Sequence, residues 1–142
     1  LFCGTGTIGQ ILSNNIPGAE VIGVDIIPQA IEDAKKNAER NSVTGLKFIA
    51  EDVGKFLKEY PQYKDNISTV VLDPPRAGIA PKTLKKVVQL NAARIVYVSC
   101  NPATQARDTE FLLNEGYQLK KLSFVDQFPH TSHVESIALF EK

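Results

Sequence analysis

The sequence predicts an α/β fold whose sheet is mostly parallel and carries an antiparallel last strand. Short β-rich runs alternate with helical stretches along the chain, which is the pattern of consecutive βαβ units. A glycine-rich turn near the start opens a helix, and only a turn separates the last two β-rich runs. At 142 residues, with 43% hydrophobic and 23% charged residues, the chain is predicted to be one globular domain.

Seven segments carry the strand prediction, the first of them only in part. Leu1-Phe2-Cys3 resembles the end of a strand, so the first strand of the sheet is expected to be largely missing and the chain to be the C-terminal part of a longer protein. The other strands are expected at 20–25, 46–50, 67–72, 94–99, 117–125 and 133–140, with 67–72 as a central strand.

The helix expected over 28–41 has the clearest pattern in the chain. Pro28 stands near its start, and Ile31, Ala34 and Ala38 are spaced to form one apolar face. Further helices are expected after the glycine turn, over 52–60 before Pro61, over 82–90, and over 104–115 before Gly116.

Composition excludes several classes of protein. No apolar run approaches the roughly 20 residues of a membrane span. The two cysteines, Cys3 and Cys100, lie far apart, which argues against a disulfide framework and favours reduced thiols in the cytoplasm. The two histidines, His130 and His133, have no further ligands at metal-site spacing, so no metal is expected. The formal net charge is zero, so any RNA substrate is expected to bind mainly through regions outside this chain.

The glycine turn predicts a nucleoside cofactor. Gly4 and Gly6 begin a G-x-G-x-x-G pattern, in which glycines let the backbone approach a ligand closely. Asp25 ends the next strand, where a carboxylate holds ribose hydroxyls. Asp52 follows the strand after that, either beside an adenine edge or as a helix cap. NAD, FAD and S-adenosylmethionine all remain open at this point.

Two further motifs stand at strand ends. Asp73-Pro74-Pro75-Arg76 is expected to form a rigid turn directly after a strand, with the Asp73 carboxylate at the strand end. Arg76 is expected either to contact a phosphate or to pair with Asp73. Cys100 follows the strand 94–99, where an Asn-Pro pair turns the chain. Because parallel sheets place their ligands at the carboxyl ends of strands, a thiol at this point suggests covalent chemistry.

Four separated motifs together resemble the RNA (uracil-5-)-methyltransferase family. They are the glycine loop, Asp73-Pro74-Pro75-Arg76-Ala77-Gly78, the run Ser99-Cys100-Asn101-Pro102-Ala103-Thr104 with Ala106-Arg107-Asp108, and the closing segments Val125-Asp126-Gln127-Phe128-Pro129-His130-Thr131 and His133-Val134-Glu135. The resemblance covers essentially the whole chain. It implies a Rossmann-like class I methyltransferase fold with a seven-stranded type of sheet.

The resemblance also implies roles for individual residues. Cys100 is expected to be the nucleophile and Glu135 the general base, with S-adenosylmethionine as the cofactor. Contacts to the cofactor or its surroundings are expected from Phe2, Gly4, Gly6, Thr7, Asp25, Asp52 and Asp73.

The implied substrate is a uridine in RNA. The run through Asn101 and Arg107 is more like the members that act on 23S ribosomal RNA than like the transfer-RNA members. Three alternatives remain: a cytosine-5 RNA methyltransferase, a NAD-binding oxidoreductase, and a catalytically silent RNA-binding module. The first does not account for His133-Val134-Glu135, and the second leaves the Asp73 and Cys100 motifs without a role. The third is disfavoured by the neutral net charge.

Overall fold

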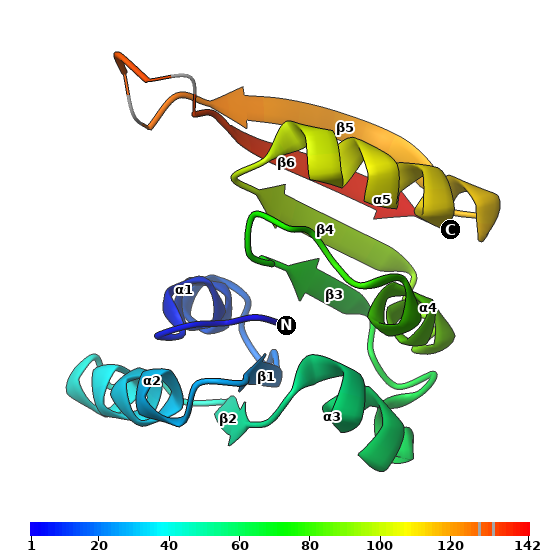
Figure 1. Ribbon diagram of the computed structural model, residues 1–142. Coiled ribbons are helices and arrows are strands. Elements are labelled where there is room, and N and C mark those ends of the chain that lie inside the picture. The colour runs from blue at the N-terminus through cyan, green and yellow to red at the C-terminus, as the bar shows by residue number, and fades with distance from the viewer. Residues whose placement is uncertain (128, 132) are drawn as a thin grey trace. The chain divides into compact units, whose positions relative to one another are not determined.

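The computed structural model describes residues 1–127, 129–131 and 133–142, and these form two compact units, Leu1–Phe56 and Leu57–Lys142. Each unit has its own β-sheet (Figure 1). The helices are α1 (Thr7–Asn15), α2 (Pro28–Arg40), α3 (Val53–Glu59), α4 (Pro81–Gln89) and α5 (Pro102–Asn114), with a 3₁₀ turn, η1, at Pro61–Tyr63. The strands are β1 (Val21–Asp25), β2 (Leu46–Ala50), β3 (Thr69–Leu72), β4 (Arg94–Ser99), β5 (Gln118–Val125) and β6 (Glu135–Glu141).

The first unit is built on the parallel pair β1–β2. The pairing runs from Val21 opposite Leu46 to Asp25 opposite Ala50, so both strands end at the same edge. Helix α2 buries the face predicted for it, formed by Ile31, Ala34 and Ala38. The prediction of this helix is therefore confirmed.

The second unit holds a four-stranded sheet in the order β3-β4-β6-β5. Strands β3 and β4 are parallel, whereas β6 runs antiparallel to both β4 and β5. The expected α/β fold with an antiparallel last strand is confirmed. Helix α5 lies along β4 and β6 (Figure 1), and the strand residues Tyr97, Ser99 and Ser136 are buried.

Two differences from the sequence prediction bear on the site. Helix α5 begins at Pro102 rather than at residue 104, because Asn101 accepts a hydrogen bond from the Ala103 amide and caps the helix. Strand β3 begins at Thr69, opposite the first residue of β4, and stands at one end of its sheet rather than at the centre. Residues 67 and 68 precede the ladder, although the Arg94 amide donates to the Ser68 carbonyl at 3.2 Å.

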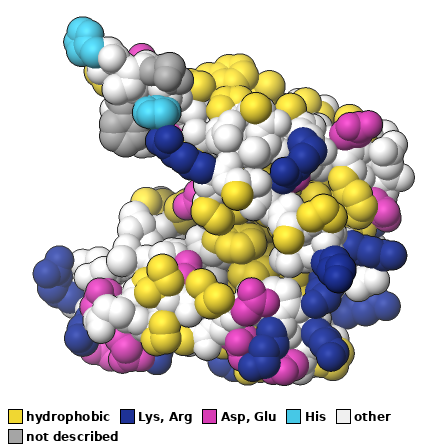
Figure 2. Space-filling model, in the orientation of Figure 1, with side chains coloured by type: hydrophobic (Ala, Val, Ile, Leu, Met, Phe, Trp, Pro, Cys, Tyr) yellow, Lys and Arg dark blue, Asp and Glu magenta, His cyan; other side chains and the backbone are white. Residues whose placement is uncertain are grey.

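The outer strand β5 leaves apolar side chains on the surface. Leu119, Leu122 and Phe124 are exposed, and Figure 2 shows hydrophobic side chains over this strand. In the described part of the chain, no helix is both long enough and apolar enough to pass through a bilayer.

Candidate active site

The antiparallel pairing of β4 with β6 brings the ends of these strands together. Ser99 is the last residue of β4 and pairs with Ser136. Cys100 follows Ser99, and Glu135 precedes Ser136, so both residues stand next to the last pair of the ladder, at the same end of β4 and β6. Both side chains are half-buried, and the Cys100 thiol is free.

Side chains on the buried face fix this end of the sheet. The Gln105 side chain of α5 is buried, and its Nε2 donates to the Tyr97 carbonyl of β4 at 2.8 Å and to the Ser136 carbonyl of β6 at 3.3 Å. The Ser136 hydroxyl donates back to Gln105 Oε1 at 2.6 Å. Gln105 therefore joins the two strands directly beside Cys100 and Glu135. Sequence analysis assigned no role to Gln105 or Ser136.

The turn through Cys100 is held from both sides. The Ser99 hydroxyl accepts from the Asn101 amide at 3.1 Å and donates to the Asn101 carbonyl at 3.0 Å. Because these two bonds span the thiol-bearing residue, they set the direction in which the chain leaves β4. The thiol is thus carried by a short, internally bonded turn between a strand and a capped helix.

The loop after β3 is tied to the loop after β4. Asn101 Nδ2 donates to the Arg76 carbonyl at 3.1 Å, and Thr104 Oγ1 lies 3.2 Å from the same oxygen. Among the described residues no ion pair joins Arg76 to Asp73, so of the two contacts expected for Arg76 the one with Asp73 is not formed. The Arg76 side chain is exposed.

Asp108 is the buried centre of this loop packing. Its Oδ2 accepts from the Ile79 amide at 2.9 Å and from the Tyr97 hydroxyl at 2.8 Å, while its Oδ1 receives two donors of Arg107. Burial first, and then the hydrogen bond to Asp108, raise the pKa of Tyr97 well above its usual value. The sequence motif contained Arg107 and Asp108 but gave them no function. The structure shows that they hold the loop around Gly78 against α5.

Replacement of Asp108 by alanine is expected to lower the free energy of unfolding by about 3 kcal/mol or more, because buried donors lose a charged acceptor. The matched control is Asp126→Ala, which removes an exposed carboxylate from the same unit. Urea unfolding followed by circular dichroism measures both variants. Equal midpoints for the two would contradict the role given to Asp108.

Asp73 follows β3 and stands near Glu135. The pKa of Asp73 is raised above its usual value, first by partial desolvation of the carboxylate and then by the negative charge of Glu135. The two carboxylates are therefore within electrostatic reach of each other. This edge of the second unit combines a thiol with two carboxylates, one of which takes up a proton more readily than an ordinary aspartate.

The first unit holds the glycine loop together with Asp25. The Gly4 amide donates to Asp25 Oδ2 at 2.8 Å, and the Ile27 amide donates to Oδ1 at 3.0 Å. Asp25 is buried, and each of its oxygens keeps a second lone pair. Gly4 has a positive φ of 50°, and a side chain there would meet no atom within 4 Å. The loop thus offers exposed backbone and open space next to a carboxylate, which fits the adenosine part of a cofactor.

Gly6 has no room for a side chain. Its φ is 79°, and an added Cβ would lie 2.7 Å from the Phe48 ring. Gly6→Ala is expected to lower the free energy of unfolding by roughly 2–4 kcal/mol, from backbone strain together with this overlap. Gly18→Ala is the control, because Gly18 has a φ of 78° but an added Cβ would meet nothing within 4 Å. Urea midpoints of the two variants separate overlap from strain, and an equal loss would show that the contact with Phe48 is unimportant.

The remaining predicted cofactor residues of this unit occupy different surroundings. Phe2 is half-buried with a positive φ of 59°, and Thr7 is exposed at the first position of α1. Asp52 caps α3, since its Oδ1 accepts from the Lys55 amide at 2.8 Å. Cys3 is half-buried, and burial raises its pKa to about 11, so this thiol stays protonated. Phe128 of the closing motif lies outside the described residues.

Comparison with known proteins identifies the family. The family model described as tRNA (uracil-5-)-methyltransferase matches residues 1–142. The chain belongs to this family. Family membership replaces the NAD-binding oxidoreductase as the interpretation of the glycine loop.

Three relatives of the chain are all named as RNA methyltransferases. The chain is 44% identical over 142 residues to an uncharacterized RNA methyltransferase of Clostridium acetobutylicum, covering 100% of this chain and 30% of that protein. It is 43% identical to the 23S rRNA (uracil(1939)-C(5))-methyltransferase RlmD of Salmonella typhimurium, covering 100% and 32%. The crystal structure of the Pyrococcus abyssi tRNA (uracil-54, C5)-methyltransferase in complex with S-adenosyl-L-homocysteine superposes with a TM-score of 0.84 at 36% identity, covering 98% and 32%. The chain spans about a third of the length of these relatives.

Proposed function

We propose that this chain carries the catalytic site of an enzyme that transfers a methyl group from S-adenosylmethionine to carbon 5 of a uridine in RNA. Family membership supports the reaction class. The observation that supports the mechanism is the pairing of Ser99 with Ser136, because Cys100 and Glu135 are the residues next to this pair at one end of β4 and β6. This methylation needs a nucleophile and a base that reach the same uracil ring.

The chemistry begins with the weakness of uracil as a nucleophile. The Cys100 thiolate adds to carbon 6 of the ring, so that a carbon–sulfur bond forms and the electrons of the C5–C6 double bond move into an enolate. S-adenosylmethionine, when bound, would supply the methyl group to carbon 5 of the enolate, with its carbon–sulfur bond broken and S-adenosylhomocysteine as the leaving group. Glu135 then removes the proton left on carbon 5. The electron pair of that C–H bond restores the double bond, and Cys100 leaves as thiolate.

The glycine loop and its neighbours are proposed to bind the cofactor. Gly4 gives the cofactor access to the backbone, Gly6 lets the loop pack against Phe48, and the spare lone pairs of Asp25 accept from ribose hydroxyls. Phe2, Thr7, Asp52 and Asp73 are proposed to complete the surroundings of the cofactor. The capping bond of Asp52 uses one carboxylate oxygen and leaves the other for a ligand.

The RNA is proposed to be 23S ribosomal RNA. Supporting this, RlmD proteins are among the relatives that are 42–44% identical over nearly the whole chain. Transfer RNA is the alternative, which the family description and the Pyrococcus abyssi structure at 36% identity favour. Regions outside this chain are proposed to supply most of the RNA affinity, because the chain has no net charge.

The test is nucleoside analysis of methylated RNA. The full-length protein is incubated with S-adenosylmethionine carrying a labelled methyl group and, separately, with unmodified 23S ribosomal RNA and unmodified transfer RNA. Mass spectrometry of the digested RNA is expected to find the label in 5-methyluridine, mainly from the ribosomal substrate. Label in 5-methylcytidine, or in no nucleoside from either RNA, would contradict the proposal.

A further inference from the structure

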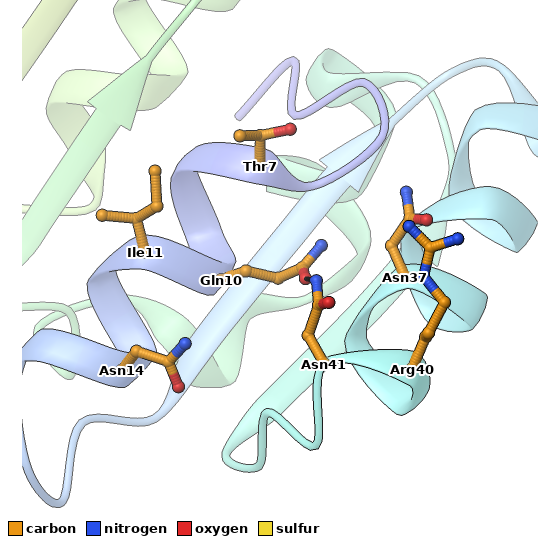
Figure 3. A pocket seen from close by; sticks show the side chains of 7 residues that line it. All are labelled: Thr7, Gln10, Ile11, Asn14, Asn37, Arg40 and Asn41. Atoms are coloured by element: carbon orange, nitrogen blue, oxygen red, sulfur yellow. Dashed lines mark hydrogen bonds between the residues drawn. The ribbon is translucent and has the colours of Figure 1, made fainter.

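A pocket lies between α1 and α2 in the first unit, away from the residues of the predicted catalytic pair in sequence. Its volume is about 330 Å³, at the lower end of the range for small-ligand sites. Seven residues from the two helices and their ends line it (Figure 3): Thr7, Gln10, Ile11, Asn14, Asn37, Arg40 and Asn41. Of these, only Thr7 received a role from the sequence.

Gln10 presents an unused donor to this pocket. Gln10 is only 7% exposed, and its Oε1 accepts a hydrogen bond from Asn41 Nδ2 at 2.9 Å. Its Nε2 has no acceptor among the described residues. Every fully buried side-chain nitrogen or oxygen among these residues has a partner, so Gln10 Nε2 is not fully buried. The Nε2 group therefore opens onto the pocket, and Figure 3 shows it turned away from Asn41. A nearly buried N–H₂ group without a protein acceptor favours a ligand that brings one.

The rest of the lining defines the chemistry of that ligand. The side-chain amides of Asn14, Asn37 and Asn41 each offer both donors and an acceptor, as the edges of nucleobases do. Arg40 is the one charged residue of the lining, and no acidic residue lines the pocket, although acidic residues outnumber basic ones in residues 1–56. Ile11 is 56% exposed and provides an apolar surface beside the amides.

We propose that this pocket binds one unpaired ribonucleotide of the RNA substrate. Gln10 donates to an acceptor on the base edge, the ring lies against Ile11, and the Arg40 guanidinium binds the phosphate. The inference rests on the proposed function for RNA as the substrate. It adds a contact within residues 7–41, a segment to which sequence analysis gave only a cofactor role.

The first test compares two charge reversals on α2. Arg40→Glu removes the proposed phosphate contact, and Lys36→Glu is the matched control, since Lys36 is exposed on the same helix but does not line the pocket. Binding of a fluorescein-labelled single-stranded RNA of about ten nucleotides is followed by anisotropy with the full-length protein in the absence of S-adenosylmethionine. The Kd is expected to rise about tenfold for Arg40→Glu and less than about twofold for Lys36→Glu. Equal effects of the two variants would overturn the proposal.

The second test reads the location directly. Ultraviolet crosslinking of the same RNA to the wild-type protein, followed by peptide mass spectrometry, is expected to place a nucleotide on the segment 7–14 or 37–41. Gln10→Leu is expected to reduce that crosslink several-fold while its thermal melting stays cooperative. A crosslink pattern that lacks both segments would overturn the proposal.

A third measurement separates RNA from the cofactor, because Thr7 also lines the pocket. Calorimetric titration of S-adenosylhomocysteine is expected to give the same Kd for wild type and Arg40→Glu. A loss of S-adenosylhomocysteine affinity with unchanged RNA affinity would assign the pocket to the cofactor and overturn the inference. Failure of the proposed function would instead appear as the absence of 5-methyluridine in the methylation assay. The binding measurements described here do not depend on formation of that product.

Discussion

Cys100→Ala is expected to abolish RNA methylation, lowering the rate by at least about 10⁴-fold. The alanine side chain has no atom that can add to the uracil ring, and without that addition carbon 5 is too weak a nucleophile. RNA affinity and the unfolding midpoint are expected to change little, because Cys100 is half-buried and its side chain makes no hydrogen bond within the described part of the chain. The rate is measured under single-turnover conditions as incorporation of the labelled methyl group into 5-methyluridine.

The matched control is Cys3→Ala. Cys3 is the other free cysteine, is also half-buried, and has a pKa raised to about 11 by burial, so it supplies almost no thiolate at neutral pH. This variant is expected to keep most of the wild-type rate. Should Cys3→Ala be inactive and Cys100→Ala active, the nucleophile has been assigned to the wrong thiol.

Glu135→Gln is expected to slow turnover by about 10²–10⁴-fold at a different step. Addition of Cys100 and methylation of carbon 5 do not need the carboxylate, but removal of the carbon 5 proton does. The variant is therefore expected to accumulate a covalent protein–RNA species that already carries the methyl group. Denaturing gel electrophoresis with labelled S-adenosylmethionine detects it as a band of reduced mobility.

Glu141→Gln provides the control for Glu135, since it changes the last residue of the same strand, which is also half-buried. No adduct is expected from Glu141→Gln. A Glu135→Gln protein that turns over at the wild-type rate would show that another group removes the proton. In that case Asp73 is the next candidate for the base, because the charge of Glu135 contributes to its raised pKa.

Much of the framework could be predicted from local sequence. The spacing of Ile31, Ala34 and Ala38 gave the buried face of α2, and the β-branched runs gave β2 and β4 with their observed bounds. These features depend on side-chain periodicity within one element, which a single segment of sequence contains. The position of Cys100 directly after β4 was predictable for the same reason.

The supports of the site depended on contacts between distant segments. Gln105 and Ser136 are 31 residues apart and meet only because β4 and β6 pair in one register. Asp108 is an acid on a helix, which in a sequence resembles a surface residue, yet it is buried under a loop 29 residues away. Asn101 donates to the backbone carbonyl of Arg76. Because every residue has a backbone carbonyl, the identity of residue 76 could not predict this hydrogen bond. The start of α5 was missed because Asn-Pro was interpreted as a turn, although Asn followed by Pro is also a good helix start.

The most direct measurement of the covalent mechanism uses RNA that contains 5-fluorouridine. Fluorine on carbon 5 cannot be removed as a proton, so the adduct formed after methyl transfer cannot break down. The full-length protein with S-adenosylmethionine is expected to form a stable adduct, and peptide mass spectrometry is expected to find the modified nucleotide on the Cys100 sulfur. An active protein that forms no adduct, or an adduct that persists in Cys100→Ala, would contradict the account.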